Sequence, residues 1–352
     1  MKVYFCNSSL SGCYYVRCLL PLRELGADGD KTSLYTEAIP EEMRAKAVLD
    51  ADVVVFHRPN DGRGLEIAKI LKGQGKKIVM DNDDTYKGFD VTLLGKMYPK
   101  IDQAIDEFGR FADLITCSTE VLKEEYLKLN PNIKVLKNCV CPEDWPSVDE
   151  IERNDGEKVR IGLVGSVGLL SDMDGFTETL RALKERKDVE IVVFALPPRD
   201  ATTIQHIQRV YEKEYKFWDD LGVERHDFVP HKDYISKLNS LRLDILVIPR
   251  KEDYFNSCKS NLKFLESSML EIPVVGSGWE SRKSPYQQNP KDAEYMDLVI
   301  DNADWFKYLD PLIASKELRR ERGAKAREYV IENYDIAKNI GQWEKTYQDL
   351  VL

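Results

Sequence analysis

Two lysines and a glutamate are spaced so that a single helix would present them side by side. Lys259, Lys263 and Glu266 lie within residues 255–277, and at 3.6 residues per turn they would share a face about 60° wide. Lys259 would then occupy the first helical turn, where the helix dipole disfavours a lysine but the free backbone N–H groups favour a polyanion. Glu266, further along, is suited to accept hydrogen bonds from hydroxyl groups. A diphosphate with hydroxyls beside it describes a nucleotide-sugar.

The same stretch carries start and stop signals for that helix. Asn256 or Ser257 would cap its start, and Pro273 limits its end. The adjoining face is apolar and would pack on a sheet through Leu262, Leu265 and Met269. The alternative is a solvated face with a Lys263–Glu266 pair, worth roughly a few tenths of a kcal/mol. Lysines at the positive end of a helix favour the binding site over that alternative.

A second cluster, DNDD at residues 81–84, directly follows the apolar run KKIVM. Three interpretations compete: oxygen ligands for Mn²⁺ or Mg²⁺, hydrogen-bond acceptors for sugar hydroxyls, or a polar turn at a strand end. We favour acceptors for hydroxyls, because a lysine site elsewhere already offers charge to a diphosphate. Arg58 and Gly12, after other expected strands, would share this wall of the site. His57 is the weaker candidate there, because a lone histidine beside an apolar strand is more often structural.

A glycine-rich turn follows another expected strand. GLVGSVG, residues 162–168, has the spacing GxxGxxG rather than the dinucleotide pattern GxGxxG. The next strand also lacks the acid that NAD binding needs at its tip, since EIVVFAL runs into PPRD. We therefore reject NAD and interpret Gly165 and Ser166 as a turn that lets a ligand approach the backbone closely. A tight turn without a ligand is the alternative.

The elements that must position these residues alternate along the whole chain. Many short runs are apolar throughout, which is typical of strands in a parallel sheet covered on both faces. We expect an α/β protein of two tandem doubly wound, Rossmann-like domains facing a cleft. Strands are expected at 2–8, 31–36, 52–58, 76–82, 113–119 and 133–138, and then at 159–166, 189–196, 226–230, 243–249, 272–277 and 297–302.

The pattern also predicts where the domains begin and end. We expect an N-terminal Rossmann-like domain over 1–143, a polar linker over 144–157, a C-terminal Rossmann-like domain over 158–330, and a C-terminal helix over 331–352. Ligands of such folds bind at the carboxyl ends of the strands. The glycine turn and DNDD both follow expected strands directly.

Composition excludes several classes of protein. The net charge of −10 disfavours nonspecific binding to nucleic acid, which needs clustered Lys and Arg. Seven scattered cysteines and four histidines show no paired CxxC or HExxH spacing, so neither a disulfide framework nor a zinc site is indicated. No apolar stretch approaches the roughly 20 residues of a membrane helix, and no secretory leader is recognisable. We expect a cytoplasmic protein without a transmembrane segment.

The order and spacing of these features resemble the GT-B glycosyltransferases. The C-terminal half is similar to their family-4-type group, the "glycosyl transferases group 1". In that group a glutamate precedes a stretch of the form A-x-x-x-G-x-P-V-V, and here LESSMLEIPVVGS places Glu266 at that position. GLVGS resembles the turn under the donor phosphates, and residues 228–250 resemble the segment whose backbone touches the nucleotide base at Val229 to His231. The last helix resembles one that crosses back to the N-terminal domain.

The resemblance implies two sets of site residues, retention of anomeric configuration, and no obligatory metal or other cofactor. The N-terminal domain would be the acceptor side and the C-terminal domain would bind the nucleotide-sugar. The donor-binding set is Gly165, Ser166, Val229, His231, Arg250, Asn256, Lys259, Ser260, Lys263 and Glu266. The set facing the acceptor or the sugar is Gly12, Arg58, Asp81, Asp83 and Asp84.

The chain departs from the family pattern in two places. A second glutamate, expected eight residues before Glu266, is Cys258, and the usual basic pair after the glycine turn is absent. Lys259 and Lys263 would supply the missing charge. A branch of the family with K-S-x-x-K-x-x-E and D-x-D-D resembles this sequence. The departures leave the donor sugar open.

We expect a glycosyltransferase that uses a UDP-, GDP- or ADP-sugar as donor substrate. The alternatives are a GT-B epimerase or phosphorylase, and a non-catalytic module that binds nucleotide-sugars, which Cys258 makes plausible. The acceptor stays open among a glycan, a lipid-linked sugar, a protein and a modified DNA base. The acidic net charge favours DNA least.

Overall fold

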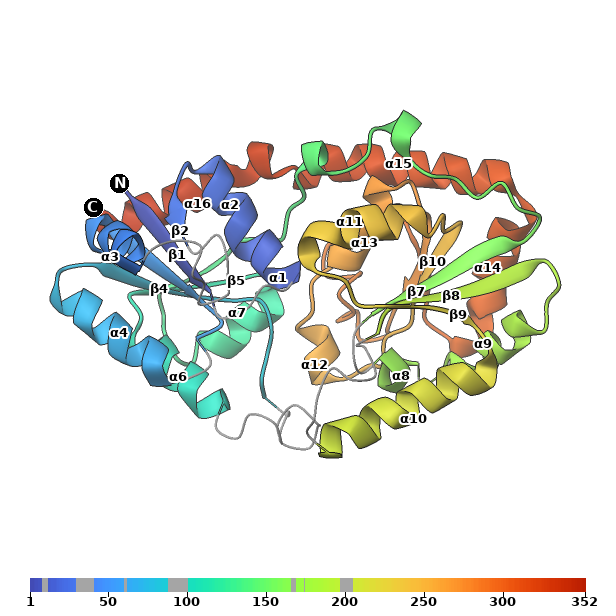
Figure 1. The fold of residues 1–352 in the computed structure, drawn as a ribbon, viewed down its shortest axis with the longest axis horizontal. Coiled ribbons are helices and arrows are strands. Elements are labelled where there is room, and N and C mark those ends of the chain that lie inside the picture. The colour runs from blue at the N-terminus through green and yellow to red at the C-terminus, as the bar shows by residue number, and fades with distance from the viewer. Residues whose placement is uncertain are drawn as a thin grey trace. The chain divides into compact units, whose positions relative to one another are not determined.

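The computed structural model describes residues 1–7, 12–29, 41–59, 62–87, 101–165, 169–173, 175–196 and 205–352. By the contacts among its residues, the chain divides into two compact units. Unit 1 comprises Met1–Cys141, Cys258–Ser260 and Tyr334–Leu352, and unit 2 comprises Pro142–Ser257 and Asn261–Asn333. Each unit is built on one parallel sheet (Figure 1). The residues expected as a linker, 144–157, belong to unit 2.

The sheet of unit 1 has the strand order β2-β1-β3-β4-β5-β6, and every pairing is parallel. Its central register places Val55 between Phe5 and Val79. The strands are β1 Val3–Asn7, β2 Asp28–Gly29, β3 Val53–His57, β4 Lys77–Asn82, β5 Leu114–Cys117 and β6 Ile133–Val135. The strand expected at 31–36 lies outside the described residues, and the other expected strands of this half are confirmed.

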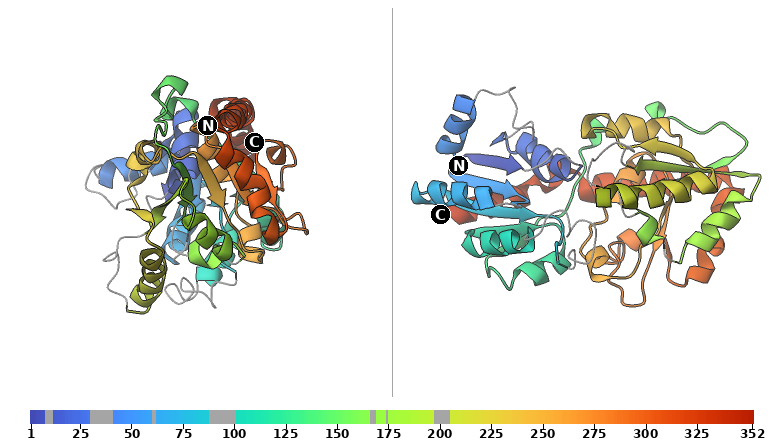
Figure 2. Two further views of the ribbon diagram at one scale, coloured as in Figure 1. Left: turned by 90° about the vertical axis from the view of Figure 1, so that its right-hand side faces the viewer. Right: turned by 60° about the horizontal axis from the view of Figure 1, so that its bottom comes forward.

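Helices cover both faces of this sheet, as the two further views in Figure 2 also show. Alternate residues of each strand enter different cores. Val53 and Val55 pack with α2 and α16, whereas Val54 and Phe56 pack with α4, α6 and α7. The helices are α1 Gly12–Tyr14, a π-helical turn Tyr15–Leu19, α2 Leu20–Glu24, α3 Glu41–Asp50, α4 Gly62–Gly73, α6 Ile101–Phe111, α7 Glu120–Tyr126 and α16 Ile336–Val351. Burial on both faces explains why these strands are apolar throughout.

The sheet of unit 2 has the order β12-β11-β10-β7-β8-β9 and is also parallel. Numbered from β7 onward, this is the order 3-2-1-4-5-6 of the doubly wound fold, with its switch point between β7 and β10. The strands are β7 Val159–Val164, β8 Val189–Leu196, β9 Glu224–Asp227, β10 Ile245–Ile248, β11 Val274–Ser277 and β12 Asp297–Val299. The two doubly wound α/β domains predicted from the sequence are therefore confirmed.

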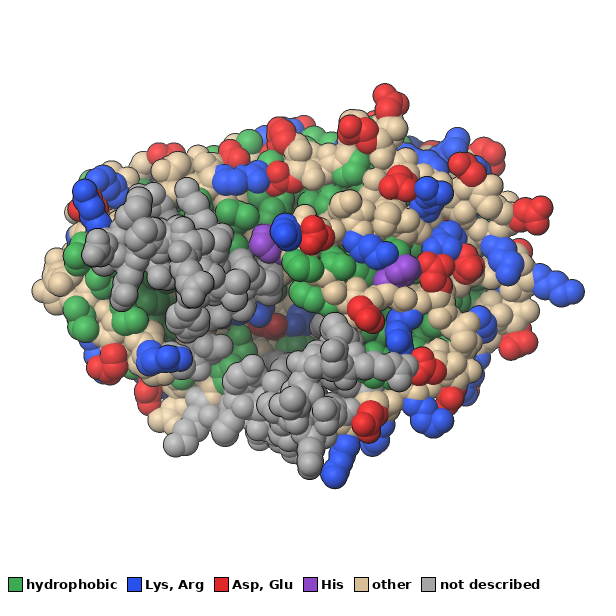
Figure 3. All heavy atoms as spheres, viewed as in Figure 1, with side chains coloured by type: hydrophobic (Ala, Val, Ile, Leu, Met, Phe, Trp, Pro, Cys, Tyr) green, Lys and Arg blue, Asp and Glu red, His purple; other side chains and the backbone are tan. Residues whose placement is uncertain are grey.

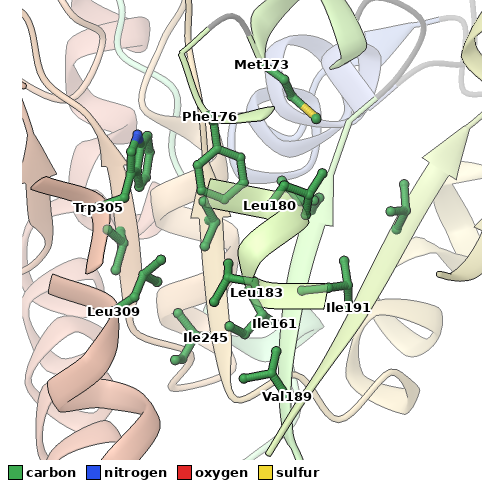
Figure 4. Packing of buried hydrophobic residues seen from close by; sticks show 14 of the residues in the cluster. Ile161, Met173, Phe176, Leu180, Leu183, Val189, Ile191, Ile245, Trp305 and Leu309 are labelled. Carbon is green, nitrogen blue, oxygen red and sulfur yellow. The ribbon is translucent and has the colours of Figure 1, made fainter. Parts of the chain in front are cut away.

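One face of this second sheet carries a large apolar core. Ile161, Ile191 and Ile245 point into it from the strands, and Phe176 lies against Trp305 with ring centroids 4.6 Å apart (Figure 4). The helices of the unit are α8 Leu169–Asp172, α9 Thr177–Lys184, α10 Gln205–Leu221, α11 His231–Ser240, α12 Tyr254–Ser257, α13 Leu262–Met269, α14 Trp305–Ala314 and α15 Lys316–Tyr334. Helices α9, α10 and α14 cover the core face, while α11 and α13 lie on the other side of the sheet (Figure 1).

The prediction of one long helix that begins near Asn256 is wrong. The structure has a short helix α12, a break, and then α13, which begins at Leu262 with Asn261 as its N-cap residue. Lys259 therefore lies in the break and not on the face that carries Lys263. The physical reason is that residues 258–260 make side-chain and backbone contacts inside unit 1. A continuous helix would break these contacts.

On the face of unit 2 that Figure 3 displays, acidic and basic side chains lie next to one another. Figure 3 shows them interspersed on the face that it displays, where they form no extended basic patch among the described residues. An extended basic patch is what nonspecific binding to nucleic acid would need. The described part of this face therefore gives no support to that class of function.

Two glycines provide a matched test of the packing. A Cβ at Gly323 in α15 would lie 1.9 Å from the carbonyl oxygen of Glu271, whereas a Cβ at Gly341 in α16 would meet nothing within 4 Å. We expect Gly323→Ala to destabilise the protein by about 1–3 kcal/mol through overpacking. We expect Gly341→Ala to stabilise it by about 0.5–1 kcal/mol, because alanine is the better helix former. Thermal denaturation of both variants checks this, and equal shifts in Tm would contradict it.

Candidate functional site

Lys263, Glu266 and Tyr234 form one hydrogen-bonded cluster in unit 2. The Lys263 Nζ lies 2.8 Å from Glu266 Oε2 and 2.7 Å from the Tyr234 hydroxyl oxygen. The Tyr234 hydroxyl in turn donates to the same Glu266 Oε2 at 2.8 Å. The ammonium group also lies 4.9 Å from the centre of the Tyr234 ring. The ion pair weighed from the sequence is thus present, but a tyrosine from another helix completes it.

Local structure explains how these side chains meet. Lys263 lies in the first turn of α13, where a lysine is locally unfavourable, and Glu266 follows on the same face three residues later. Tyr234 comes from the start of α11 and stacks on Phe194 of β8, with ring centroids 5.6 Å apart. The three side chains surround a space too small to hold a water molecule, together with Val164, the last residue of β7. The cluster therefore lies at the carboxyl end of the central strand, where doubly wound folds bind ligands.

The cluster keeps its lysine charged and its tyrosine protonated. Burial by itself would lower the pKa of Lys263, but Glu266 and then Tyr234 hold that pKa above its usual value. Burial and then Glu266 raise the pKa of the Tyr234 hydroxyl. At neutral pH the site therefore offers one ammonium group, one phenolic donor and the Glu266 side chain.

A second cluster in unit 2 joins Arg250, Asp172 and Asn256. The Arg250 Nη1 lies 2.5 Å from Asp172 Oδ2, and Asn256 Nδ2 donates to Asp172 Oδ1 at 2.7 Å. The Arg250 backbone N–H donates to the Ser277 hydroxyl oxygen, at the end of β11. Among the described residues, the buried Arg250 Nε has no hydrogen-bond partner. Two predicted donor residues, Arg250 and Asn256, are thus brought together, and Asp172 is the acid that joins them.

The remaining donor residues of unit 2 lie at strand ends. Gly165 follows β7, and its N–H donates to the Phe194 carbonyl oxygen at 3.1 Å, so this amide is used in the sheet. Ser166 lies outside the described residues. Val229 is half-buried in the loop after β9, and His231 is the first residue of α11. Burial lowers the pKa of His231, which keeps the imidazole neutral at neutral pH.

In unit 1, Asp81 forms a completely buried ion pair with Arg17. The Arg17 Nη2 lies 2.5 Å from Asp81 Oδ2, and the side chains of both residues are 0% exposed. Thr116 donates to the same carboxylate at 2.7 Å, while Arg17 also donates to the Leu136 carbonyl oxygen and to Asn138. Asp81 therefore has structural partners for its charge, and we leave it out of the proposed site below.

The other two aspartates of DNDD share Arg58. The Asp83 Oδ1 accepts from Arg58 Nε at 2.6 Å and lies 3.3 Å from His57 Nε2. The Asp84 Oδ2 lies 3.5 Å from Arg58 Nη2 and 2.7 Å from Lys259 Nζ. Burial by itself would raise the pKa of Asp83, but Arg58 and then His57 hold that pKa well below its usual range. Both carboxylates are thus paired with cations of unit 1.

The backbone at the end of β3 aims Arg58 at these carboxylates. Arg58 has a φ of 50°, in the left-handed region that residues with side chains rarely adopt, and its N–H donates to the Asp81 carbonyl oxygen at 2.9 Å. Its Nη2 also donates to the sulfur of Cys13, the neighbour of Gly12 in α1. Gly12 itself is exposed. The predicted grouping of Arg58 with Asp83 and Asp84 is thus present in the structure.

The segment Cys258–Ser260 makes three polar contacts within unit 1. The Cys258 carbonyl oxygen accepts from the Thr119 hydroxyl at 3.3 Å, Lys259 pairs with Asp84, and the Ser260 hydroxyl accepts from Asn138 at 2.8 Å. Lys259 and Ser260 were predicted as donor-binding residues. In the structure Lys259 pairs with Asp84, as Lys263 pairs with Glu266, and its predicted contact with the donor stays a prediction.

Sequence reasoning missed three residues that organise these clusters. Arg17 has a visible signal, because an arginine inside the apolar run YYVRCLL needs a buried partner. Asp172 lies in the segment where the family's basic pair is missing, and the sequence does not show that it faces Arg250. Tyr234 carries no sequence signal, since its partners come from α13 and β8.

Among the described residues, no group of three or more His, Cys, Asp or Glu side chains could hold a metal ion. No helix in the described part of the chain has the length and apolar character needed to cross a membrane.

Comparison with known proteins yields one curated relative and many solved structures. No protein-family model matches the chain. N-acetyl-alpha-D-glucosaminyl L-malate synthase of Bacillus anthracis is 22% identical over 298 residues, which are 81% of this chain and 71% of that enzyme. TarM of S. aureus superposes with a TM-score of 0.58 at 16% identity and covers 84% of this chain. The chain spans only about half of TarM, 54% of its length.

The Anabaena protein HepE, solved with UDP and glucose, matches over the full length. Its TM-score is 0.67 at 13% identity, and the match covers 99% of each chain. This chain has the GT-B fold. The predicted GT-B resemblance and fold class are thereby confirmed. The GT-B proteins found are glycosyltransferases, which supports the predicted transferase class.

The buried Arg17–Asp81 pair of this GT-B chain gives a stability prediction. Asp81→Asn should destabilise unit 1 by about 3–5 kcal/mol, because the variant leaves the Arg17 charge buried without a counterion. Asp50→Asn is the control, since Asp50 pairs with Lys2 only at 4.0 Å and both side chains are more than half exposed. It should change stability by less than about 0.5 kcal/mol. Urea denaturation checks both, and an equal loss in the two variants would contradict the assignment.

Proposed function

We propose that the protein transfers a sugar from a nucleotide-diphosphate sugar to an acceptor hydroxyl. The bond between the anomeric carbon and the diphosphate oxygen breaks, and the nucleoside diphosphate leaves with the bonding electrons. The acceptor oxygen forms the new bond to that carbon and gives its proton to the leaving diphosphate, so that atoms and charge balance. The cluster of Lys263, Glu266 and Tyr234 at the carboxyl end of β7 carries this proposal.

The donor diphosphate is bound by Lys263 and Arg250 in this proposal. Glu266 and Tyr234 hold the pKa of Lys263 above its usual value, and Arg250 follows β10, the strand next to β7 at the switch point of the sheet. Each cation is paired with an acid of the chain, Glu266 or Asp172, so the site is already neutralised before an anion enters. A diphosphate would compete with those acids for the cations and take over part of their hydrogen bonding.

UDP is the first nucleotide to test. HepE was solved with UDP and glucose, and TarM with UDP, and both share the GT-B fold with this chain. In our proposal, Glu266 accepts hydrogen bonds from hydroxyls of the ribose, the alternative of the donor-sugar hydroxyls being tested by the comparison of UDP with UDP-sugars. Val229, in the loop after β9, and His231, the first residue of α11, border the base.

Asp83, Asp84 and Arg58 face the acceptor or the sugar in this proposal. The carboxylates of Asp83 and Asp84 follow β4, and ion pairs with Arg58 hold them in place. Three observations support a reaction without a divalent metal. Asp81 is paired with Arg17, Asp83 with Arg58, and Asp84 with Lys259, so the carboxylates of DNDD have cationic partners within the chain. Retention of anomeric configuration follows from the family resemblance.

An assay of hydrolysis and transfer tests the proposal. The full-length protein is incubated separately with UDP-, GDP- and ADP-sugars, and the released nucleotide and the glycosylated products are measured by mass spectrometry. Release of nucleoside diphosphate that depends on an added acceptor supports a transferase. Interconversion of the sugar on the nucleotide would support an epimerase instead, and binding without turnover would support a non-catalytic module.

Glu266 gives the sharpest prediction for the donor site. Glu266→Gln should weaken UDP binding by about 1.5–3 kcal/mol, because it removes the charge that strengthens hydrogen bonds from hydroxyls. The Tm should change little, because the Lys263 and Glu266 side chains keep 24% and 12% exposure to water, whereas Arg17 and Asp81 have none. Glu328→Gln, an exposed position on α15, is the matched control and should bind UDP like the wild type. Isothermal titration calorimetry measures both. A large loss of stability with intact UDP binding would assign Glu266 a structural role.

Metal independence makes a separate prediction. Transfer activity should survive exhaustive EDTA treatment, because cations of the chain already balance the DNDD carboxylates. The variants Asp83→Asn and Asp84→Asn should lose turnover while keeping UDP affinity. Activity that EDTA abolishes and Mn²⁺ or Mg²⁺ restores would make DNDD a metal site and reject this part of the proposal.

A further inference from the structure

We propose that Tyr234 is a positioning residue for the donor site, and that its hydroxyl fixes Glu266 in the orientation that receives the hydroxyls of the nucleotide-sugar. This inference rests on the proposed function. It concerns a side chain that the sequence analysis did not identify. The observation behind it is that one phenolic oxygen contacts both charged groups of the cluster.

The contacts show how Tyr234 acts through its neighbours. Its hydroxyl donates to Glu266 Oε2 at 2.8 Å and accepts from Lys263 Nζ at 2.7 Å. Lys263 reaches the same Oε2 at 2.8 Å, so the three polar groups close a triangle. An i,i+3 pair of Lys and Glu alone stabilises a helix by little and leaves both side chains free to change rotamer. The hydroxyl adds the third contact that restricts them.

The second carboxylate oxygen of Glu266, Oε1, is the atom that this arrangement leaves for a ligand. Both hydrogen bonds go to Oε2, and Oε1 has no hydrogen-bond partner among the described residues. Tyr234 and Lys263 thereby hold one oxygen and leave the other to accept from a ligand. A ribose or a hexose presents adjacent hydroxyls, which are hydrogen-bond donors of the kind that a carboxylate oxygen accepts.

Tyr234 is itself held rigidly enough for this role. Its ring stacks on Phe194 with an angle of 19° between the ring planes, and Phe194 is completely buried in β8. Tyr234 also lies in the first turn of α11, whose N-cap residue is Pro230. One side chain therefore connects β8, α11 and α13, the elements that carry the proposed contacts to the base and to the hydroxyls.

The test compares Tyr234→Phe with Tyr347→Phe, using UDP as the probe. Tyr234→Phe keeps the ring and its stacking on Phe194 and removes only the hydroxyl. UDP affinity should fall by about five-fold, which corresponds to one hydrogen bond. Tyr347 is the matched control, because its buried hydroxyl has no hydrogen-bond partner among the described residues. Tyr347→Phe should bind UDP like the wild type. Tyr234→Phe should lower the Tm slightly, because it loses hydrogen bonds to two charged groups.

A double-mutant cycle separates positioning from an independent contact. If Tyr234 acts through Glu266, Tyr234→Phe should cause no further loss of UDP affinity in a Glu266→Gln background. The same loss in both backgrounds, or unchanged affinity in Tyr234→Phe alone, overturns the inference. A wild-type protein that binds none of UDP, GDP and ADP overturns the proposed function itself, and this inference with it.

Discussion

The buried pair of Arg17 and Asp81 is the interaction on which the candidate site of unit 1 depends. A charge without water around it is tolerated only when its partners are complete. Arg17 meets this requirement with Asp81, Asn138 and the carbonyl oxygen of Leu136. Its guanidinium also lies 4.7 Å from the ring centre of Trp343 in α16. The end of β4, the chain after β6, and two helices are therefore fixed to the same group.

Charge balance is a property that the candidate clusters share. The chain carries a net charge of −10, yet Arg17, Arg58, Lys259, Lys263 and Arg250 are each paired with an acid in the structure. Such pairs avoid isolated buried charges, and they also set the cost of admitting an anion, which must replace one partner by another. The two cations of unit 2 lie in pairs that a ligand with oxygen acceptors could take over in this way.

The sequence predicted most of the fold because burial on both faces makes each strand apolar. The apolar runs around Val55 and Val193 are typical of strands that are buried on both faces of a parallel sheet. The break between Ser257 and Leu262 could not be predicted, because its cause is a set of contacts with residues more than a hundred positions earlier. Tyr234 was missed because its partners come from other elements, with Lys263 and Glu266 lying 29 and 32 positions later in the chain. The grouping of Arg58 with Asp83 and Asp84 was foreseen because parallel strands end at the same edge of a sheet.

The π-helical turn Tyr15–Leu19 has a consequence for how this chain can change. A π-turn is an α-helix with one residue inserted, so deleting a single residue there would restore a regular helix. The deletion would rotate one part of the helix against the other by about 100°. Arg17 lies within the turn, and its direction toward Asp81 depends on that extra residue. In evolution, single substitutions along α2 leave this geometry in place. A deletion between Gly12 and Leu20 would instead turn Arg17 away from Asp81.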